Sequence, residues 1–212
     1  MIAPITTPLI DKEKRLLAAT SISPVRLELG CGTSKRDPSS IGVDLLDAPG
    51  VDVVGEAAEV LASLPDSSVS HIYSEHFLEH LDDLQGLLVQ VSRVLADEGA
   101  FVAIVPHFSN PYFYSDPTHK MPFGLYTFCY LADSALFART VPRYTFDYGL
   151  HLDRVTLRFK ASRPFYVRYA IRRTIGFVVN LNPWLQEFWE DVLSGVVSCY
   201  EIEYQLHRKS RL

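Results

Sequence analysis

Short apolar runs recur along the first half of the chain and predict a series of strands. They lie at residues 25–29, 41–45, 51–54, 69–74 and 100–105. Before the last run, apolar residues follow helical spacing up to a glycine: Leu81, Leu84, Leu87, Leu88, Val91, Val94, Leu95 and then Gly99. Strands separated by helices and turns are typical of a mostly parallel sheet with helices on both faces. We therefore predict an α/β three-layer sandwich.

The second half of the chain has a different pattern. Residues 106–150 are rich in aromatic and loop-forming residues, and alternating runs at 155–159 and 200–206 predict a sixth and a seventh strand. Helical sequence separates these two runs. We predict a single domain over residues 1–212, with an N-terminal arm at 1–20 and a helical insertion at 164–196.

Composition narrows the class of protein. The chain has 212 residues, of which 48% are hydrophobic and 21% charged, as in ordinary globular proteins. Its net charge of -5 argues against a nucleic-acid partner, which usually requires a basic surface. Three widely spaced cysteines suit a reducing compartment. Without a signal-like start or a membrane-spanning stretch, we expect a cytoplasmic protein.

The stretch from Val25 to Asp44 carries the most informative chemistry. Its first strand ends in Gly30-Cys31-Gly32, and its second strand ends in Asp44. Glycines at the end of a strand let a ligand approach the backbone, and an acid at the end of the next strand can accept hydrogen bonds from a ribose diol. The stretch therefore predicts half of a nucleoside-binding site.

Two features of this stretch argue against a dinucleotide as the ligand. A third glycine is missing, because Ser34 or Lys35 stands in its place, and Asp44 comes too early for a full crossover helix. Glu28, two residues before the first glycine, would repel a pyrophosphate but could serve an ammonium group, directly or through water. A ligand with a ribose, a positive amino-acid end and no phosphate fits, and S-adenosylmethionine is such a ligand.

With these features the sequence resembles the class I S-adenosylmethionine-dependent methyltransferases. The similar segments lie at residues 28–32, 42–44, 55–57, 74–81 and 103–107. The resemblance implies a Rossmann-like fold with a seven-stranded, mostly parallel sheet and an antiparallel last strand beside the fifth. It also implies S-adenosyl-L-methionine as cofactor. The expected cofactor-binding residues are Glu28, Gly30, Cys31, Gly32, Asp44, Glu56, Ala57, Glu75 and His76.

The methyl acceptor is expected to meet the segment after the fifth strand. Histidine is the natural general base for a hydroxyl acceptor, so we predict His107 or His119 in that role and Asp116 as an orienting group. The aromatic loop at 108–128 would exclude water. The run from Asp116 to His119 is similar to one in relatives associated with cell-surface glycan pathways. We therefore predict O-methylation of a saccharide or another small hydroxylated acceptor.

Several alternatives stay open from sequence alone. The acceptor atom could be nitrogen or carbon of a small metabolite, or the chain could bind the cofactor without catalysis. His76 and His80 match a zinc-peptidase pattern, but no later motif supplies a further carboxylate ligand, so we assign no metal. Glu79 and His80 are instead expected to cap or line the following helix. A basic stretch followed by Trp184 leaves peripheral membrane contact open. The C-terminal hairpin and the aromatic insertion offer surface for a homodimer.

Overall fold

The computed structural model describes residues 9–20, 24–142, 147–161 and 164–210. The chain divides into two compact units, which are described separately. Unit 1 comprises Met1–Phe77, Asp83–Val102 and Arg208–Leu212, and unit 2 comprises Leu78–Asp82 and Ala103–His207. Residues 1–8 of the N-terminal arm lie outside the described residues.

Unit 1 holds the strands that the apolar runs predict. They are β2 (Val25–Leu29), β3 (Ile41–Asp44), β4 (Val53–Val54), β5 (Val69–Glu75) and the first part of β6 (Leu95–Pro106). β2 pairs in parallel with both β3 and β5, and β3 pairs in parallel with β4. Because the strands run parallel, their carboxyl ends meet at one edge of the sheet, where ligands bind in such folds.

One short strand at the start of unit 1 was not predicted from the sequence. The two-residue strand β1 (Ile10–Asp11) pairs antiparallel with β4, and η1 (Lys12–Lys14) leads into α1 (Arg15–Thr20). A two-residue strand shows no alternation, so the hydrophobic pattern carries no signal for it. With β1, the sheet formed by the described residues has eight strands instead of the predicted seven.

The helices of unit 1 are α2 (Ala57–Ala62) and α3 (Leu84–Val94). Their apolar sides contribute fully buried residues such as Val60, Leu61 and Val91 to the core. Asp83 caps α3, because its side chain accepts a hydrogen bond from the Gly86 amide at 2.8 Å. Leu95 is already extended, so the helix ends earlier than the sequence pattern suggests.

Unit 2 holds the rest of β6, the strands β7 (Leu150–Arg158) and β8 (Glu201–Arg208), and the helices α4 (Tyr166–Val179) and α5 (Pro183–Phe188). A π-helical segment, η5 (Trp189–Leu193), follows α5. Short 3-10 turns are η2 (Leu78–His80), η3 (Phe113–Ser115) and η4 (Thr127–Tyr130). Its core contains large aromatic residues, including fully buried Trp189, Tyr204, Phe123 and Phe128.

The last strand runs antiparallel to β7, as predicted. The Tyr200 amide donates to the Arg158 carbonyl oxygen at 3.0 Å, whereas His207, near the other end of β8, contacts Asp153 in β7. The strand order is β1-β4-β3-β2-β5-β6-β8-β7, so β8 lies next to β6, the fifth strand of the sequence-based count. The predicted Rossmann-like α/β fold is confirmed. No helix in the described parts of the chain is long and apolar enough to cross a membrane.

Candidate active site

The loop that follows β2 depends on two glycines with positive φ. Gly30 has φ 68° and Gly32 has φ 57°, a region that residues with a side chain rarely adopt. A Cβ atom at Gly30 would lie 2.7 Å from the Cβ atom of Phe77, so no larger residue fits there. A Cβ atom at Gly32 would meet no heavy atom within 4 Å. The backbone at Gly32 therefore borders the open space that a ligand needs.

Asp44 joins this loop to the end of β3. Its carboxylate accepts hydrogen bonds from the Gly32 amide and from the Leu46 amide, each at 2.9 Å. A carboxylate has about four lone-pair sites, so these two bonds leave acceptor capacity for further donors. Asp44 thus stands at the carboxyl edge with room to receive hydroxyl groups.

Glu28 and Lys35 shape the short crossover between β2 and β3. Both carboxylate oxygens of buried Glu28 accept from the Arg36 amide at 3.0 Å. Lys35 Nζ donates to the Ser40 carbonyl oxygen and to Asp52 Oδ2, at 2.8 and 2.6 Å. These side chains take the place of a crossover helix, which is absent from the fully described segment 30–40.

Asp52 is a structural residue that sequence reasoning missed. It is buried and also accepts from the Gly42 amide at 2.9 Å. Burial opposes its ionisation, but hydrogen bonds from Lys35, the Gly42 amide and Arg15 outweigh burial and lower the pKa of Asp52. An acid between the valines of residues 51–54 was the signal in the sequence. Asp52 connects α1, through Arg15, to the loop after the glycines, through Lys35.

Cys31 packs between the glycines and is buried. Burial, followed by the negative charges of Asp44, Glu28 and Asp52, raises the pKa of its thiol to about 12. A thiol is a poor nucleophile when it stays protonated. The packing of Cys31 therefore favours close approach of the backbone rather than covalent chemistry.

The remaining cofactor candidates follow β4 and β5. Glu56 is exposed at the N-terminus of α2, and Ala57 is buried behind it. Glu75 accepts a hydrogen bond from the Tyr73 hydroxyl, and Tyr73 also lies under the Arg36 guanidinium, whose carbon is 4.6 Å from the ring centroid. His76 has a left-handed backbone, with φ 53°. All nine predicted cofactor residues thus lie at or beside the carboxyl ends of strands of unit 1.

The three predicted catalytic residues lie in unit 2, and His107 is fully buried there. Its Nδ1 lies 2.8 Å from Ser109 Oγ, and its Nε2 lies 2.9 Å from Glu190 Oε2. The ring packs between Phe108 and Trp189, with centroid distances of 4.4 and 5.3 Å. A methyl acceptor could reach either ring nitrogen only by displacing Ser109 or Glu190. This geometry favours a structural role over the predicted role as base.

His119 is arranged differently. Its Nδ1 lies 2.8 Å from the Phe113 carbonyl oxygen, which can only accept, so Nδ1 carries a proton and, in the neutral ring, the lone pair is on Nε2. Nε2 lies 3.8 Å from Asp116 Oδ2 and 4.0 Å from Glu79 Oε1. The ring stacks on Phe113 with a centroid distance of 5.0 Å. His119 therefore has a fixed tautomer and a basic nitrogen that faces two carboxylates.

His80 presents a second basic nitrogen to the same place. The Thr118 hydroxyl donates to Asp116 Oδ1 at 2.6 Å and lies 2.9 Å from His80 Nδ1. Because its single proton goes to Asp116, Thr118 accepts from Nδ1, which leaves the lone pair on Nε2 of His80. Ligand atoms of Glu79, His80 and His119 lie within 4.8 Å of one another. We call Glu79, His80, Asp116 and His119 the histidine cluster.

Glu79 and His80 are the main correction in this region. The sequence predicted that they cap or line the next helix, but they lie in η2 and Asp83 caps α3 instead. Glu79 is fully buried, whereas a residue at a polar helix start would be exposed. The Lys120 amide donates to the Glu79 carbonyl oxygen at 2.7 Å, which brings the loop of His119 to η2.

Comparison with known proteins places the chain in a functional class. Residues 37–103 match a family model described as a methyltransferase domain. The chain therefore carries a methyltransferase domain. The methyltransferase is similar to a SAM-dependent methyltransferase from Archaeoglobus fulgidus, with 21% identity, a TM-score of 0.56 and coverage of 92% of this chain and 90% of that one.

Two further structures share the fold at lower identity. Phosphoethanolamine N-methyltransferase 2 of Haemonchus contortus, in complex with S-adenosyl-L-methionine, is 14% identical, with a TM-score of 0.52 and coverage of 89% of this chain and 49% of that one. A putative methyltransferase of Bacillus halodurans is 13% identical, with a TM-score of 0.52 and coverage of 93% and 100%. No curated protein matches the sequence. At these identities the likeness concerns the fold, and the acceptor has to be argued from the site.

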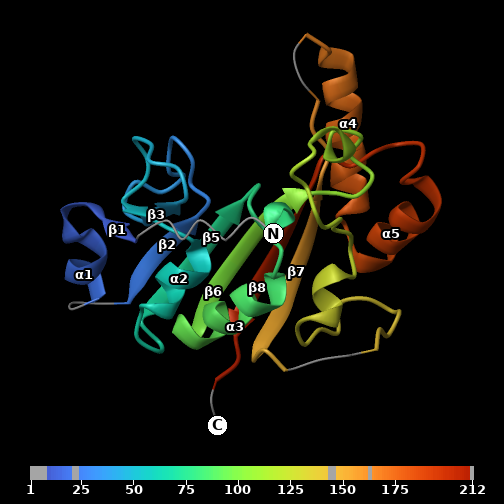
Figure 1. The fold of residues 1–212 in the computed structure, drawn as a ribbon. Helices are drawn as coiled ribbons and strands as arrows, with labels where there is room; N and C mark the ends of the chain where they lie inside the picture. The colour runs from blue at the N-terminus through green and yellow to red at the C-terminus, as the bar shows by residue number, and fades with distance from the viewer. Residues whose placement is uncertain (1–8, 21–23, 143–146, 162–163, 211–212) are drawn as a thin grey trace, which may run out of the picture. The chain divides into compact units, whose positions relative to one another are not determined.

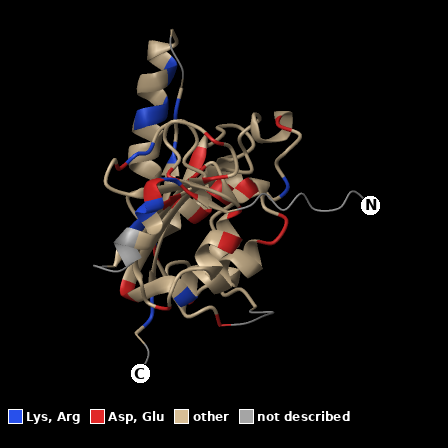
Figure 2. Cartoon of the chain, turned by 60° about the vertical axis from the view of Figure 1, so that its left-hand side comes forward, with Lys and Arg blue, Asp and Glu red and all other residues tan. Residues whose placement is uncertain are grey.

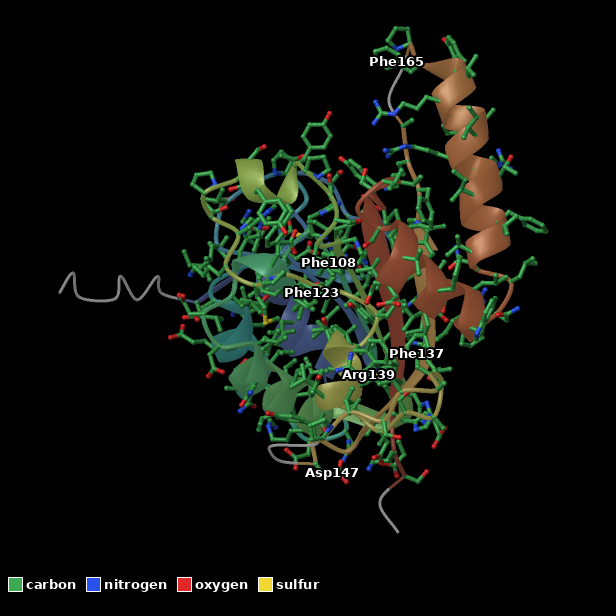
Figure 3. All side chains as sticks on the ribbon, turned by 90° about the vertical axis from the view of Figure 1, so that its right-hand side faces the viewer. Phe108, Phe123, Phe137, Arg139, Asp147 and Phe165 are labelled. Atoms are coloured by element: carbon green, nitrogen blue, oxygen red, sulfur yellow. The ribbon has the colours of Figure 1, made fainter. Side chains whose placement is uncertain are left out.

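In the methyltransferase, Glu190 holds the aromatic loop of unit 2 in place. Its Oε2 accepts from the Leu125 amide at 2.8 Å while it also contacts His107. The Phe108 amide donates to the Phe123 carbonyl oxygen at 2.8 Å, and Figure 3 shows where these two side chains lie in the unit. Glu190 comes from η5, far along the chain, so no local pattern predicts this contact. The loop predicted to exclude water is therefore anchored by the helical insertion.

Proposed function

We propose that the methyltransferase transfers the methyl group of S-adenosylmethionine to a hydroxyl group of a saccharide or another small hydroxylated acceptor. The observation that carries this proposal is the fixed tautomer of His119, whose Nε2 faces Asp116 and Glu79. A hydroxyl is a poor nucleophile until a base accepts its proton. A histidine positioned as a base therefore favours an oxygen atom as the methyl acceptor.

We propose that unit 1 binds the cofactor. The backbone at Gly30, Cys31 and Gly32 would border the methionine part, and Asp44 would accept hydrogen bonds from the ribose diol. Glu56 and Ala57 would meet the adenine, and Glu75 and His76 would border the site. Glu28 would act through the loop that it holds. When bound, S-adenosylmethionine supplies an electrophilic methyl group on a sulfonium.

We propose that His119 Nε2 accepts the proton of the acceptor hydroxyl. The Phe113 carbonyl oxygen keeps Nδ1 protonated, so that only Nε2 is available as the base. The negative charges of Asp116 and Glu79 would stabilise the imidazolium that forms. A positioned base contributes about 100- to 10,000-fold to the rate.

The test compares His119→Ala with His71→Ala as a matched control, since His71 is exposed near the start of β5. Formation of S-adenosylhomocysteine would be followed with a panel of hydroxylated sugars and phenols. We expect His119→Ala to lower kcat by about 100-fold or more and His71→Ala to leave it unchanged. Equal turnover of the two variants would show that His119 is not the base.

A chelator distinguishes a base from a metal site in the histidine cluster. Two imidazole nitrogens and a carboxylate are also ligands that zinc accepts, although no metal is part of this proposal. We expect EDTA to leave turnover unchanged. If EDTA abolished turnover and zinc restored it, the cluster would hold a metal ion, and His119 would be its ligand rather than a base.

A further inference from the structure

Helix α4 leaves its apolar side chains outside the core of unit 2. Val179 is its only buried residue, although the helix consists mostly of apolar and aromatic residues. Val167 is 75% exposed, Phe177 70% and Ile171 55%. A contiguous exposed apolar surface of this kind usually marks a binding surface, because water does not solvate it favourably.

The orientation of α4 is the reverse of an ordinary surface helix. Arg172 points from α4 toward the rest of unit 2. Its guanidinium donates to the Lys160 carbonyl oxygen at 2.8 Å and to Ser198 Oγ at 3.0 Å. Gly176 lies on the same side, against Phe159. At about 100° per residue, the exposed Tyr169 falls on the side of Arg172, and the other exposed apolar residues fall on the opposite half of the helix. They are Tyr166, Val167, Ala170, Ile171, Phe177 and Val178. We call these residues the α4 face.

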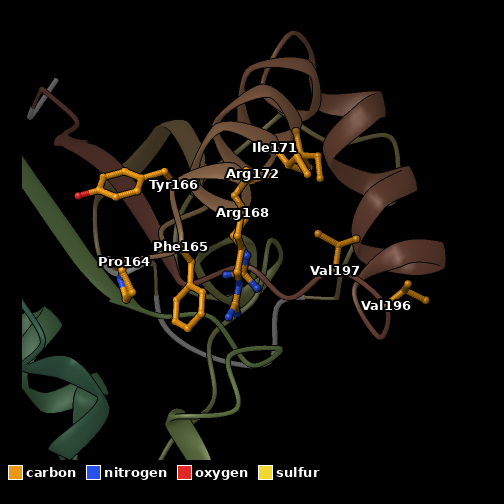
Figure 4. Close-up of a pocket in the computed structure, with 10 residues that line it drawn as sticks. Pro164, Phe165, Tyr166, Arg168, Ile171, Arg172, Val196 and Val197 are labelled. Carbon is orange, nitrogen blue, oxygen red and sulfur yellow. The ribbon is translucent and has the colours of Figure 1, made fainter.

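An open hollow adjoins the α4 face. Its volume is about 670 Å³, and apolar side chains such as Ile171, Val196 and Val197 line it together with Arg168 and Arg172 (Figure 4). Burial and the positive charge of Arg168 lower the pKa of Arg172. Among the described residues, no carboxylate forms an ion pair with Arg168 or Arg172. The hollow therefore offers apolar walls and two guanidinium groups to a ligand.

The charge around the α4 face is locally positive, although the whole chain has a net charge of -5. The sequence from Arg154 to Gln186 contains no acidic residue. Its basic residues are Arg154, Arg158, Lys160, Arg163, Arg168, Arg172 and Arg173. Arg158 and Lys160 form ion pairs with Glu203 and Glu201, so the positive charge beside the α4 face comes from Arg168, Arg172 and Arg173. Figure 2 shows basic segments on α4 and no acidic one. By helical position, Arg168 and Arg173 flank the two edges of the α4 face.

We propose that the α4 face docks on the surface of an anionic lipid bilayer. An apolar helix face flanked by arginines can enter the boundary between headgroups and acyl chains while the guanidinium groups contact lipid phosphates. The nearby Trp184 is 64% exposed and stacks on Phe188, with ring centroids 5.6 Å apart. Trp and Phe side chains of this kind anchor interfacial helices.

Charge argues against a second copy of the chain as the occupant. A symmetric contact would bring the arginines of both copies together, and this part of the sequence supplies no acid to pair with them. Juxtaposed like charges oppose association. A bilayer that contains anionic lipid supplies an apolar interior that can cover the α4 face. It also supplies negative charge that can pair with the flanking arginines.

The test is co-sedimentation of the full chain with vesicles. Vesicles of phosphatidylcholine alone would be compared with vesicles in which about a third of the lipid is phosphatidylglycerol. We expect binding only to the anionic vesicles, and we expect added salt to weaken it. Arg173→Gln should weaken binding about fivefold, whereas Lys14→Gln, an exposed charge change in unit 1, should leave it unchanged.

Phe177→Asp and Val89→Asp form a second matched pair, since both side chains are exposed and both variants should fold. We expect Phe177→Asp to abolish vesicle binding and Val89→Asp, on α3, to retain it. Trp189 is buried, so a blue shift of the tryptophan fluorescence on adding anionic vesicles would report the entry of Trp184 into the bilayer. Absence of binding, equal binding to neutral vesicles, or a dimer in sedimentation that Phe177→Asp dissociates would each overturn the proposal.

Discussion

Unit 1 and unit 2 place their candidate site residues by different physical means. In unit 1 the residues follow directly on the ends of parallel strands, and backbone contacts such as Gly32 to Asp44 define their geometry. In unit 2 the histidine cluster brings Glu79 and His80 to Asp116 and His119 through loops and 3-10 turns. The first arrangement depends on backbone conformation, and the second depends on side chains that are distant in sequence. Substitutions should therefore act differently in the two units.

The largest expected effect is at Gly30. Gly30→Ala places a Cβ atom against Phe77 and forces alanine into a positive φ, so it should lower the free energy of unfolding by about 3 kcal/mol and abolish cofactor binding. Gly32→Ala meets the same strain without the clash, and about 1 kcal/mol is expected. Chemical denaturation and calorimetry with S-adenosylmethionine would measure both. Equal losses would show that backbone strain alone, and not the contact with Phe77, constrains the loop.

His107 tests whether all histidines of unit 2 belong to one functional set. His107→Ala removes a fully buried ring and its contacts with Glu190 and Ser109, so we expect the free energy of unfolding to fall by about 2 to 3 kcal/mol. The exposed His71→Ala is the control. Thermal unfolding and turnover per folded molecule would be compared. A His107→Ala variant with normal stability and abolished kcat would restore His107 as the base.

Asp52 gives unit 1 a specific dependence on pH. Its pKa is lower in the folded chain than its ordinary value of 3.8, so its contribution to stability is present above that value. The contribution is lost as pH falls through the folded pKa. We expect denaturation at pH 3 and at pH 6 to show a steeper loss for the natural chain than for Asp52→Asn. Glu59→Gln, which changes an exposed acid on α2, should follow the natural chain. If Asp52→Asn lost as much stability between pH 6 and pH 3 as the natural chain, Asp52 would not be ionised in the folded chain.

The smallest expected effect is at Asp116. Its carboxylate is exposed and lies 3.8 Å from His119 Nε2, so screening by water limits its influence. Hydrogen bonds from the Thr118 hydroxyl and then the Thr118 amide lower the pKa of Asp116, which keeps it ionised. Asp116→Asn should lower kcat about two- to fivefold. Asp82→Asn, another exposed acid of unit 2, should leave kcat unchanged, and a loss as large as that of His119→Ala would make Asp116 itself essential.

The same contrast explains how far the sequence predicts the molecule. The strands of unit 1 and the Gly30-to-Asp44 stretch were predictable because the hydrophobic period and the glycines are local signals. The burial of His107 was not, because its partner Glu190 comes from the helical insertion. Asp52 was missed because a single acid in a short apolar run does not reveal which cations will reach it. Sequence patterns report backbone geometry well and distant side-chain partners poorly.

The central claim is that cofactor binding and acceptor activation reside in different units. Calorimetric binding of S-adenosylmethionine to Asp44→Ala and His119→Ala, with thermal unfolding to confirm folding, tests it most directly. We predict that Asp44→Ala loses measurable binding, because Asp44 would hold both the glycine loop and the ribose. We predict that His119→Ala keeps the affinity of the natural chain. Natural affinity in Asp44→Ala, or an equal loss in His119→Ala, would contradict the account.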